Sequence, residues 1–202
     1  MLLLAKVRAR LARLFYARFF KPAGVDLAAD VRLNGWPLFA SYAGSSIVIG
    51  RGGVLCSEPS MTALGVRQPV IFRTLTGKAR ISVGRDCGFS GTTVVAATSI
   101  TIGNNCMLGA NVTIFDTDFH NVHSTTRRYE PVDWDAISAP VSIADNVFIG
   151  TGAIICKGVT IGENSVIGAG SVVTKSIPAN SIAAGNPCRV LGEVKAGPAD
   201  HV

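Results

Sequence analysis

Aliphatic residues recur at every sixth position through much of this chain, and this period limits the possible folds more than any other feature. The same spacing returns upstream, with traces as far as the segments 33–39 and 49–55. The positions in the long runs are Val83, Phe89, Val95, Ile102, Leu108, Ile114, Ile143, Ile149, Ile155, Ile161, Ile167 and Val173. A period of six fits neither an α-helix nor an alternating strand that ends in a hairpin.

Such a period indicates a short strand, a corner and another short strand, so that three sides close one coil. The aliphatic residues point inward and stack on their equivalents in neighbouring coils, which buries a core that no single repeat could bury. Glycine often follows the aliphatic residue and tolerates the backbone angles of a sharp corner. We therefore predict an all-β parallel β-helix over residues 23–192, with a tail at 193–202; a β-sandwich is the less consistent alternative.

Two segments interrupt the repeats. The first covers about residues 57–68 and is punctuated by proline and glycine. The second, 116–140, contains His120, His123, two arginines, a tryptophan and five acids. A long aperiodic segment of this composition in a compact repeat protein is typical of a functional loop. We expect it to project from the β-helix and build the active site.

The charge is concentrated at the N-terminus. Six of the 19 Lys and Arg residues lie in 1–21 without an acid, and the remaining 13 match the 13 Asp and Glu. This balance argues against a nucleic-acid partner. Residues 1–22 read as a basic amphipathic helix. Three roles stay open for residues 1–21: a cap on the first coil, peripheral contact with the inner face of a membrane, or a contact with other copies of the chain in a trimer. We expect a cytoplasmic protein without a spanning segment.

The five cysteines are odd in number and include no C-x-x-C pair, which disfavours a disulfide framework or a zinc site. We expect the cysteines to be small residues of the core, kept reduced in a reducing compartment.

Three segments carry a resemblance to a known family: 79–95, SITIGNNCMLGANVTIFDTDFHN (99–121), and the stretch 141–190 with its closing GAGSVVTK and GNPCR strings. They resemble the hexapeptide-repeat acyltransferases, in the group of maltose and nodulation-factor O-acetyltransferases. The resemblance implies a left-handed β-helix and a homotrimer. It also implies that acetyl-CoA and a sugar acceptor meet between neighbouring prisms, with no metal required.

The resemblance further implies that His120 is the general base and that Ser90 touches the acceptor. Coenzyme contacts map onto Gly150, Thr151, Gly168, Ala169, Thr174, Lys175 and Arg189. Many relatives have Trp where Phe148 stands, so packing near the coenzyme can differ from theirs. Close relatives often have Asn where Ser90 stands, so the acceptor can differ too.

Acetyl transfer from a thioester requires a base, a site that stabilises the oxyanion, and residues that bind the coenzyme. Imidazole suits the first task, with His123 as the fallback. Asp116 or Asp118 can orient the ring or bind a sugar hydroxyl, and backbone N–H groups near Gly150 are oxyanion candidates. The acceptor can be a polysaccharide, lipid-linked or nucleotide-linked sugar. The alternatives are N-acetylation of an amino sugar, a metal-dependent sugar enzyme using Asp116 and Asp118, and a non-catalytic scaffold.

Overall fold

The computed structural model describes residues 22–195, so the expected helix at 1–21 and residues 196–202 of the tail lie outside the described residues. Three sheets run the length of the described chain, and each coil gives one strand to each sheet. Sheet A contains β1 (Val25–Leu27), β4 (Ser46–Ile49), β7 (Arg80–Val83), β10 (Ser99–Ile102), β13 (Val141–Ile143) and β16 (Thr160–Ile161). Sheet B contains β2 (Arg32–Asn34), β5 (Val54–Cys56), β8 (Gly88–Ser90), β11 (Met107–Leu108), β14 (Phe148–Ile149), β17 (Val166–Ile167), β19 (Ser181–Gly185) and β20 (Cys188–Glu193). Sheet C contains β3 (Leu38–Ala40), β6 (Ile71–Thr74), β9 (Thr93–Ala96), β12 (Thr113–Phe115), β15 (Ile154–Ile155) and β18 (Val172–Val173).

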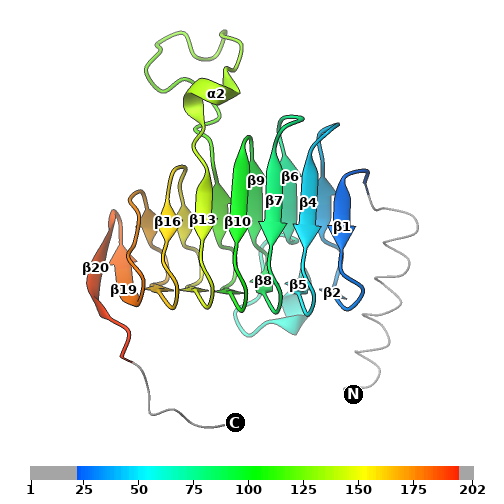
Figure 1. Cartoon of the computed structure of the whole chain (residues 1–202), viewed down its shortest axis with the longest axis vertical. Coiled ribbons are helices and arrows are strands. Elements are labelled where there is room, and N and C mark those ends of the chain that lie inside the picture. Colours follow the sequence, from blue (N-terminus) through cyan, green and yellow to red (C-terminus); the bar gives the residue numbers. More distant parts are fainter. Residues whose placement is uncertain (1–21, 196–202) are drawn as a thin grey trace.

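The strands wind as a left-handed parallel β-helix, called the prism below. In Figure 1 the strands of sheet A run downward at the front while the coils advance from right to left, which gives the left-handed sense. All neighbouring strands pair in parallel except the final β19–β20 hairpin. Among the described residues, no helix is long and apolar enough to cross a membrane.

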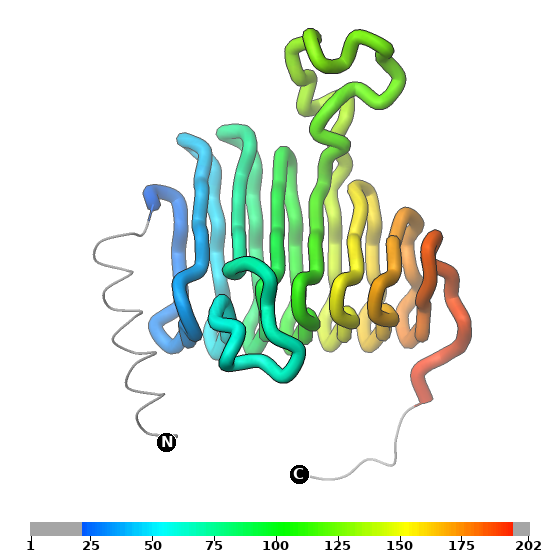
Figure 2. Tube along the Cα trace, turned by 180° about the vertical axis from the view of Figure 1, so that it is seen from behind, coloured from blue at the N-terminus to red at the C-terminus, as the bar shows by residue number. Residues whose placement is uncertain are grey.

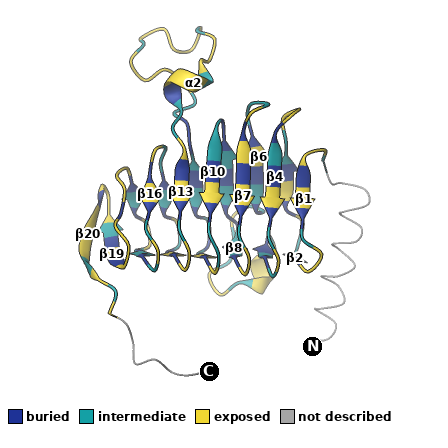
Figure 3. Ribbon diagram, in the orientation of Figure 1, coloured by how far each residue is buried: buried dark blue, intermediate teal, exposed yellow. Residues whose placement is uncertain are grey.

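The six-residue period places the core columns correctly at all but one position. Ile143, Ile149, Ile155, Ile161, Ile167 and Val173 are each at most 1% exposed, and Figure 3 shows buried positions recurring along the strands of successive coils. The prediction for Val95 is wrong by one residue, because Val94 is the buried partner of Ile114 and Val95 pairs with Phe115. The corner after Phe89 is one residue shorter than the corner after Leu108. Gly91 permits this tight turn with a φ of +54°.

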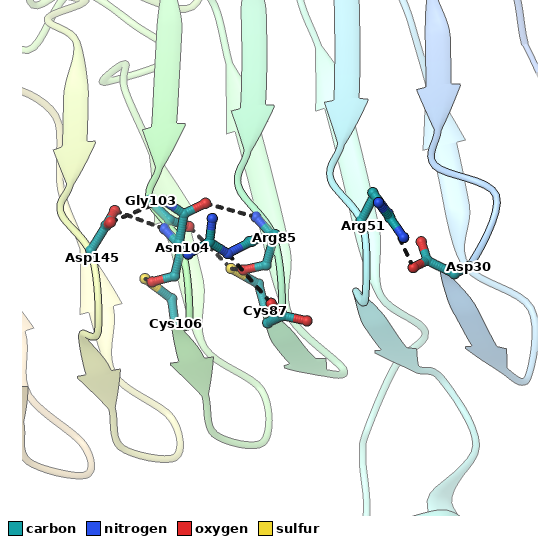
Figure 4. A network of polar contacts seen from close by, with 9 residues as sticks. Asp30, Arg51, Arg85, Cys87, Gly103, Asn104, Cys106 and Asp145 are labelled. Carbon is teal, nitrogen blue, oxygen red and sulfur yellow. Dashed lines mark hydrogen bonds and ion pairs between the residues drawn. The ribbon is translucent and has the colours of Figure 1, made fainter. Parts of the chain in front are cut away.

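Polar side chains form a ladder along the corner between sheets A and B. Asp145 accepts hydrogen bonds from the backbone N–H and the side-chain amide of Asn104, at 2.8 and 2.9 Å. Asn104 in turn accepts from the backbone N–H of Arg85 at 3.0 Å (Figure 4). Cys87 and Cys106 stack beside this ladder, and their thiols donate to the carbonyls of Gly103 and Ala144. These bonds join successive coils at a corner that lacks strand pairing.

Two segments leave the prism at different sheets. The segment between β5 and β6, which includes the turn η1 (Pro59–Met61), lies against the side of the prism (Figure 2). The segment between β12 and β13 rises well beyond the coils and contains the short helix α2 (Trp134–Ile137). The second segment is called the projecting loop below. It begins where sheet C ends, so that corner is where its functional side chains gather.

Candidate active site

The projecting loop leaves the prism through a narrow two-stranded neck. Thr117 and Ser138 form an antiparallel bridge. Asp118 N donates to the Ile137 carbonyl at 3.2 Å, and Ala139 N donates to the Asp116 carbonyl at 2.8 Å. The backbone groups of a connecting segment require partners, and this pairing supplies them where the loop leaves the sheet.

Asp116 anchors the base of the neck rather than facing a ligand. Its side chain is fully buried. Its carboxylate accepts from Ala97 N and Thr98 N, both at 2.7 Å, and from Thr98 Oγ1 at 2.8 Å. A buried carboxylate requires such donors. The structure therefore gives Asp116 a structural role, which differs from the expected contact with a sugar hydroxyl.

His120 follows a tight and strained turn. Its N–H donates to the Asp118 carbonyl at 2.7 Å, and Phe119 between them has a φ of +63°. Positive φ is rare for a bulky side chain, and such strain gathers at functional sites. The Phe119 ring packs against Phe115 with centroids 5.7 Å apart. The His120 side chain is exposed, and its ring makes no hydrogen bond to any described residue.

Asp118, unlike Asp116, lies beside His120 in an open cavity. Its Oδ2 is 2.5 Å from Lys157 Nζ, and Lys157 also donates to the Ile137 carbonyl at 2.9 Å. The cavity has a volume of about 500 Å³ between the two limbs of the loop. Its ionisable lining consists of Asp118, His120, His123, Arg127, Glu130, Asp133 and Lys157. Both histidines proposed as bases thus face one space.

Glu130 organises the far end of the loop. It accepts from Ser124 Oγ, and from Thr126 Oγ1 at 2.5 Å. The hydrogen bonds from Ser124 and then Thr126 lower the pKa of the Glu130 carboxyl. Arg127 Nε donates to the Asn121 carbonyl at 3.3 Å. This end of the cavity wall is therefore built by the loop's own polar contacts, while Lys157 contributes to the lining from the prism.

The structure does not bring Ser90 into this cavity. Ser90 lies at the end of β8 on sheet B and lines a second hollow of about 360 Å³ with Met61, Thr62, Met107 and Phe148. No residue lines both hollows. Within one chain, therefore, the expected acceptor contact and the expected base are separate.

The expected coenzyme residues fall at two corners on either side of sheet C. Gly150, Thr151, Gly168 and Ala169 stack at the corner that follows sheet B, where Gly150 N donates to the Ile167 carbonyl at 2.7 Å. Arg189 pairs with Ala184 near the same corner. Thr174 and Lys175 follow β18 at the opposite corner.

The corner of stacked small residues is suited to a narrow ligand. A Cβ at Gly152 or Gly170 would meet no atom within 4 Å, and both residues have a φ of +68°. The N–H groups of Thr151 and Ala169 make no hydrogen bond to a described residue, whereas that of Gly150 belongs to the coil ladder. Of the N–H groups near Gly150, where we expected an oxyanion donor, that of Thr151 is thus without a partner among residues 22–195. Lys175 and Arg189 are exposed and form no ion pair within 22–195.

The two aspartates of the D-x-D pattern do not form a shared site. Asp116 is turned toward Thr98 and Asp118 toward Lys157. Across residues 22–195, no three His, Cys, Asp or Glu side chains are grouped so that they could hold a metal ion. The paired carboxylates that a D-x-D metal site requires are therefore not formed.

Lys157 is the residue of this site that the sequence reasoning missed. Its signal is a lysine that interrupts the apolar repeat between Ile155 and Val159. Its contact with Asp118 joins the corner after β15 to the start of the projecting loop after β12. The six-residue period does not predict contacts between such segments.

Comparison with known proteins shows what this chain is similar to. Residues 140–175 match the family described as bacterial transferase hexapeptide (six repeats), and residues 80–115 match the hexapeptide repeat of succinyl-transferase. A galactoside O-acetyltransferase of Escherichia coli is 44% identical over 102 residues, which cover 50% of this chain and 48% of that protein. A galactoside O-acetyltransferase of Lactococcus lactis is 43% identical over 124 residues, covering 61% of this chain and 57% of that protein.

A solved galactoside acetyltransferase in complex with coenzyme A is similar over a longer stretch. It is 30% identical with a TM-score of 0.52, and the match covers 94% of this chain and 80% of that one. The chain spans about half the length of the curated relatives that it matches.

Proposed function

Because this chain belongs to the hexapeptide-repeat acyltransferases, in the group of sugar O-acetyltransferases, we propose that it transfers an acetyl group from acetyl-CoA to a sugar hydroxyl. The observation that carries the proposal is the projecting loop, which holds His120 on a strained turn at an open cavity beside Asp118 and Lys157. The solved relative that binds coenzyme A supports the choice of donor.

His120 is the general base in this proposal. Its exposed ring accepts the proton of the acceptor hydroxyl while the hydroxyl oxygen attacks the thioester carbonyl. As the carbon–sulfur bond breaks, the imidazolium returns that proton to the departing sulfur. Thr151 lies at the corner across sheet C from the loop of its own chain, so in this proposal the Thr151 N–H of a neighbouring chain stabilises the oxyanion between these two steps. No protein nucleophile is required, because acceptor and donor react directly in a ternary complex.

The corner of Gly150, Thr151, Gly168 and Ala169 receives the coenzyme's narrow arm in this proposal. Small side chains and two free N–H groups favour close contact with an amide-containing chain. Arg189 lies near this corner, whereas Thr174 and Lys175 lie at the corner across sheet C. The two cations, Lys175 and Arg189, suit phosphate groups because neither has a carboxylate partner within 22–195.

We further propose that the active enzyme is a homotrimer. Ser90 and His120 line separate hollows in one chain, so a single prism does not bring the acceptor contact to the base. The loop projects well beyond the coils (Figure 1), so in this proposal it extends toward the side of a neighbouring prism. A cyclic arrangement would join the His120 hollow of one chain to the Ser90 hollow of the next.

An acceptor screen tests the proposed reaction. Acetyl-CoA consumption is measured with free, lipid-linked and nucleotide-linked sugars, each beside its amino-sugar analogue. An alkali-labile product indicates an ester and supports O-acetylation. An alkali-stable product that forms only with amino sugars would replace the proposal by N-acetylation. Loss of turnover on chelation, restored by a divalent metal, would contradict both.

A further inference from the structure

Lys157 lies beneath the projecting loop and bonds to both limbs of its neck. The residue follows β15, at the corner between sheets C and A. Its Nζ is 2.5 Å from Asp118 Oδ2 on the outgoing limb and 2.9 Å from the Ile137 carbonyl on the returning limb. The Lys157 side chain is 32% exposed and that of Asp118 is 25% exposed. One partly shielded ammonium group therefore ties the two limbs together.

Asp118 links Lys157 to His120 over a very short path. The Asp118 carbonyl accepts from His120 N at 2.7 Å, and the strained Phe119 is the only residue between them. A strained turn persists only where its surroundings hold it. Here those surroundings are the Phe115 ring, the Ile137 carbonyl and the Lys157 ammonium. A shift of Asp118 therefore moves the His120 backbone directly.

The ammonium group of Lys157 has little capacity for a further partner. An ammonium group has three donors, and Asp118 and Ile137 occupy two of them. Lys175 and Arg189, by contrast, have no carboxylate partner among the described residues. The contacts of Lys157 are thus directed at the loop rather than at a bound ligand.

A second lysine contacts the same loop and provides a matched control. Lys78 pairs with Asp135, which lies in α2. Both side chains are largely exposed, at 56% and 70%, and exposed pairs contribute little to stability. The Lys78 pair does not touch the turn at Phe119.

We propose that Lys157 is a positioning residue for acetyl transfer, which holds the Asp118–Phe119–His120 turn so that the imidazole faces the reacting hydroxyl. This inference rests on the proposed role of His120 as the base. Lys157 acts through Asp118 and touches neither substrate.

The kinetic test compares Lys157→Met, Lys157→Arg and Lys78→Met in the full chain. Lys157→Met is expected to lower kcat by about 10- to 100-fold with an unchanged KM for acetyl-CoA, because small misplacement of a catalytic group has effects of this size. Arginine should recover most of that loss, since its guanidinium can reach both the carboxylate and the carbonyl. Lys78→Met should keep the wild-type rate. A wild-type kcat in Lys157→Met, or a raised acetyl-CoA KM in its place, would overturn the proposal.

A spectroscopic test decides the point without turnover. The chain has three histidines, so protein carrying ring-labelled histidine gives three resolvable signals, and His120→Ala assigns the relevant one. Lys157→Met should shift the His120 signal, while Lys78→Met should leave it in place. An unmoved His120 signal in Lys157→Met contradicts the proposal. If His120→Ala instead keeps wild-type turnover, the proposed base is wrong, yet the spectra still show whether Lys157 sets the turn.

Discussion

Replacing Asp116 by alanine tests whether this residue anchors the loop or binds the acceptor. The carboxylate is fully buried and accepts three hydrogen bonds, from Ala97 N, Thr98 N and Thr98 Oγ1. Its removal leaves these donors unpaired inside the protein, and each such group costs about 1–3 kcal/mol. Water can enter the space left by the truncation and satisfy part of this loss. We therefore expect the free energy of unfolding to fall by about 3–5 kcal/mol.

Urea unfolding followed by circular dichroism measures this change, with Asp133→Ala as the control in the same loop. Asp133 caps α2 through bonds of 3.1 and 3.3 Å from Asp135 N and Ala136 N at the exposed surface. Loss of this cap should cost no more than about 1 kcal/mol. The reasoning is refuted if Asp116→Ala unfolds at the wild-type midpoint while the acceptor KM rises, because Asp116 would then bind substrate.

Three further predictions follow from other parts of the structure. Lys175→Ala and Arg189→Ala should raise the KM for acetyl-CoA more than they lower kcat, since contacts far from the reacting carbonyl stabilise ground and transition states alike; an unchanged KM in both variants would exclude the phosphate role. Light scattering of an active preparation should give the mass of a trimer, and an active monomer would contradict the shared site. Hydrogen bonds from Asn104, first from its side chain and then from its N–H, lower the pKa of the Asp145 carboxyl. The contact therefore contributes to the stability of the folded state above the unfolded pKa of this carboxyl. That contribution is lost as the pH falls through the lowered folded pKa. Asn104→Ala should therefore reduce Tm more at about pH 7 than at about pH 2. The loss of the bond from Arg85 N is common to both pH values, so an equal reduction at both would refute the assigned cause.

The six-residue period was sufficient to predict the architecture and most of the core, because inward positions in a β-helix recur with the coil. Val95 shows the limit of that reasoning. The sequence gives the spacing Phe89–Val95, but the buried Gly91 shortens the corner by one residue and brings Val94 inward. Corner length depends on backbone angles, which hydrophobic spacing does not report.

The sequence was sufficient to predict those parts of the site that residue type alone identifies. It was not sufficient for the parts that depend on the orientation of side chains. Two histidines in a long aperiodic loop identified the loop, and both histidines face its cavity. The roles of Asp116 and Asp118 could not be separated, since only the folded neck turns one carboxylate toward buried amides and the other toward Lys157. The sequence marks Lys157 only as a lysine in the apolar repeat, and its contacts with Asp118 and Ile137 follow from the position of the corner after β15 beneath the loop.

Transfer of labelled acetyl from acetyl-CoA to the best sugar acceptor, compared between wild type, His120→Ala and His123→Ala, tests the central claim most directly. Coenzyme affinity is measured by calorimetry on the same preparations. The account predicts that His120→Ala lowers turnover by about 10²- to 10⁴-fold, the usual contribution of a positioned base, with an unchanged coenzyme Kd, and that His123→Ala remains active. Turnover above a tenth of the wild-type rate in His120→Ala, together with an inactive His123→Ala, would contradict it.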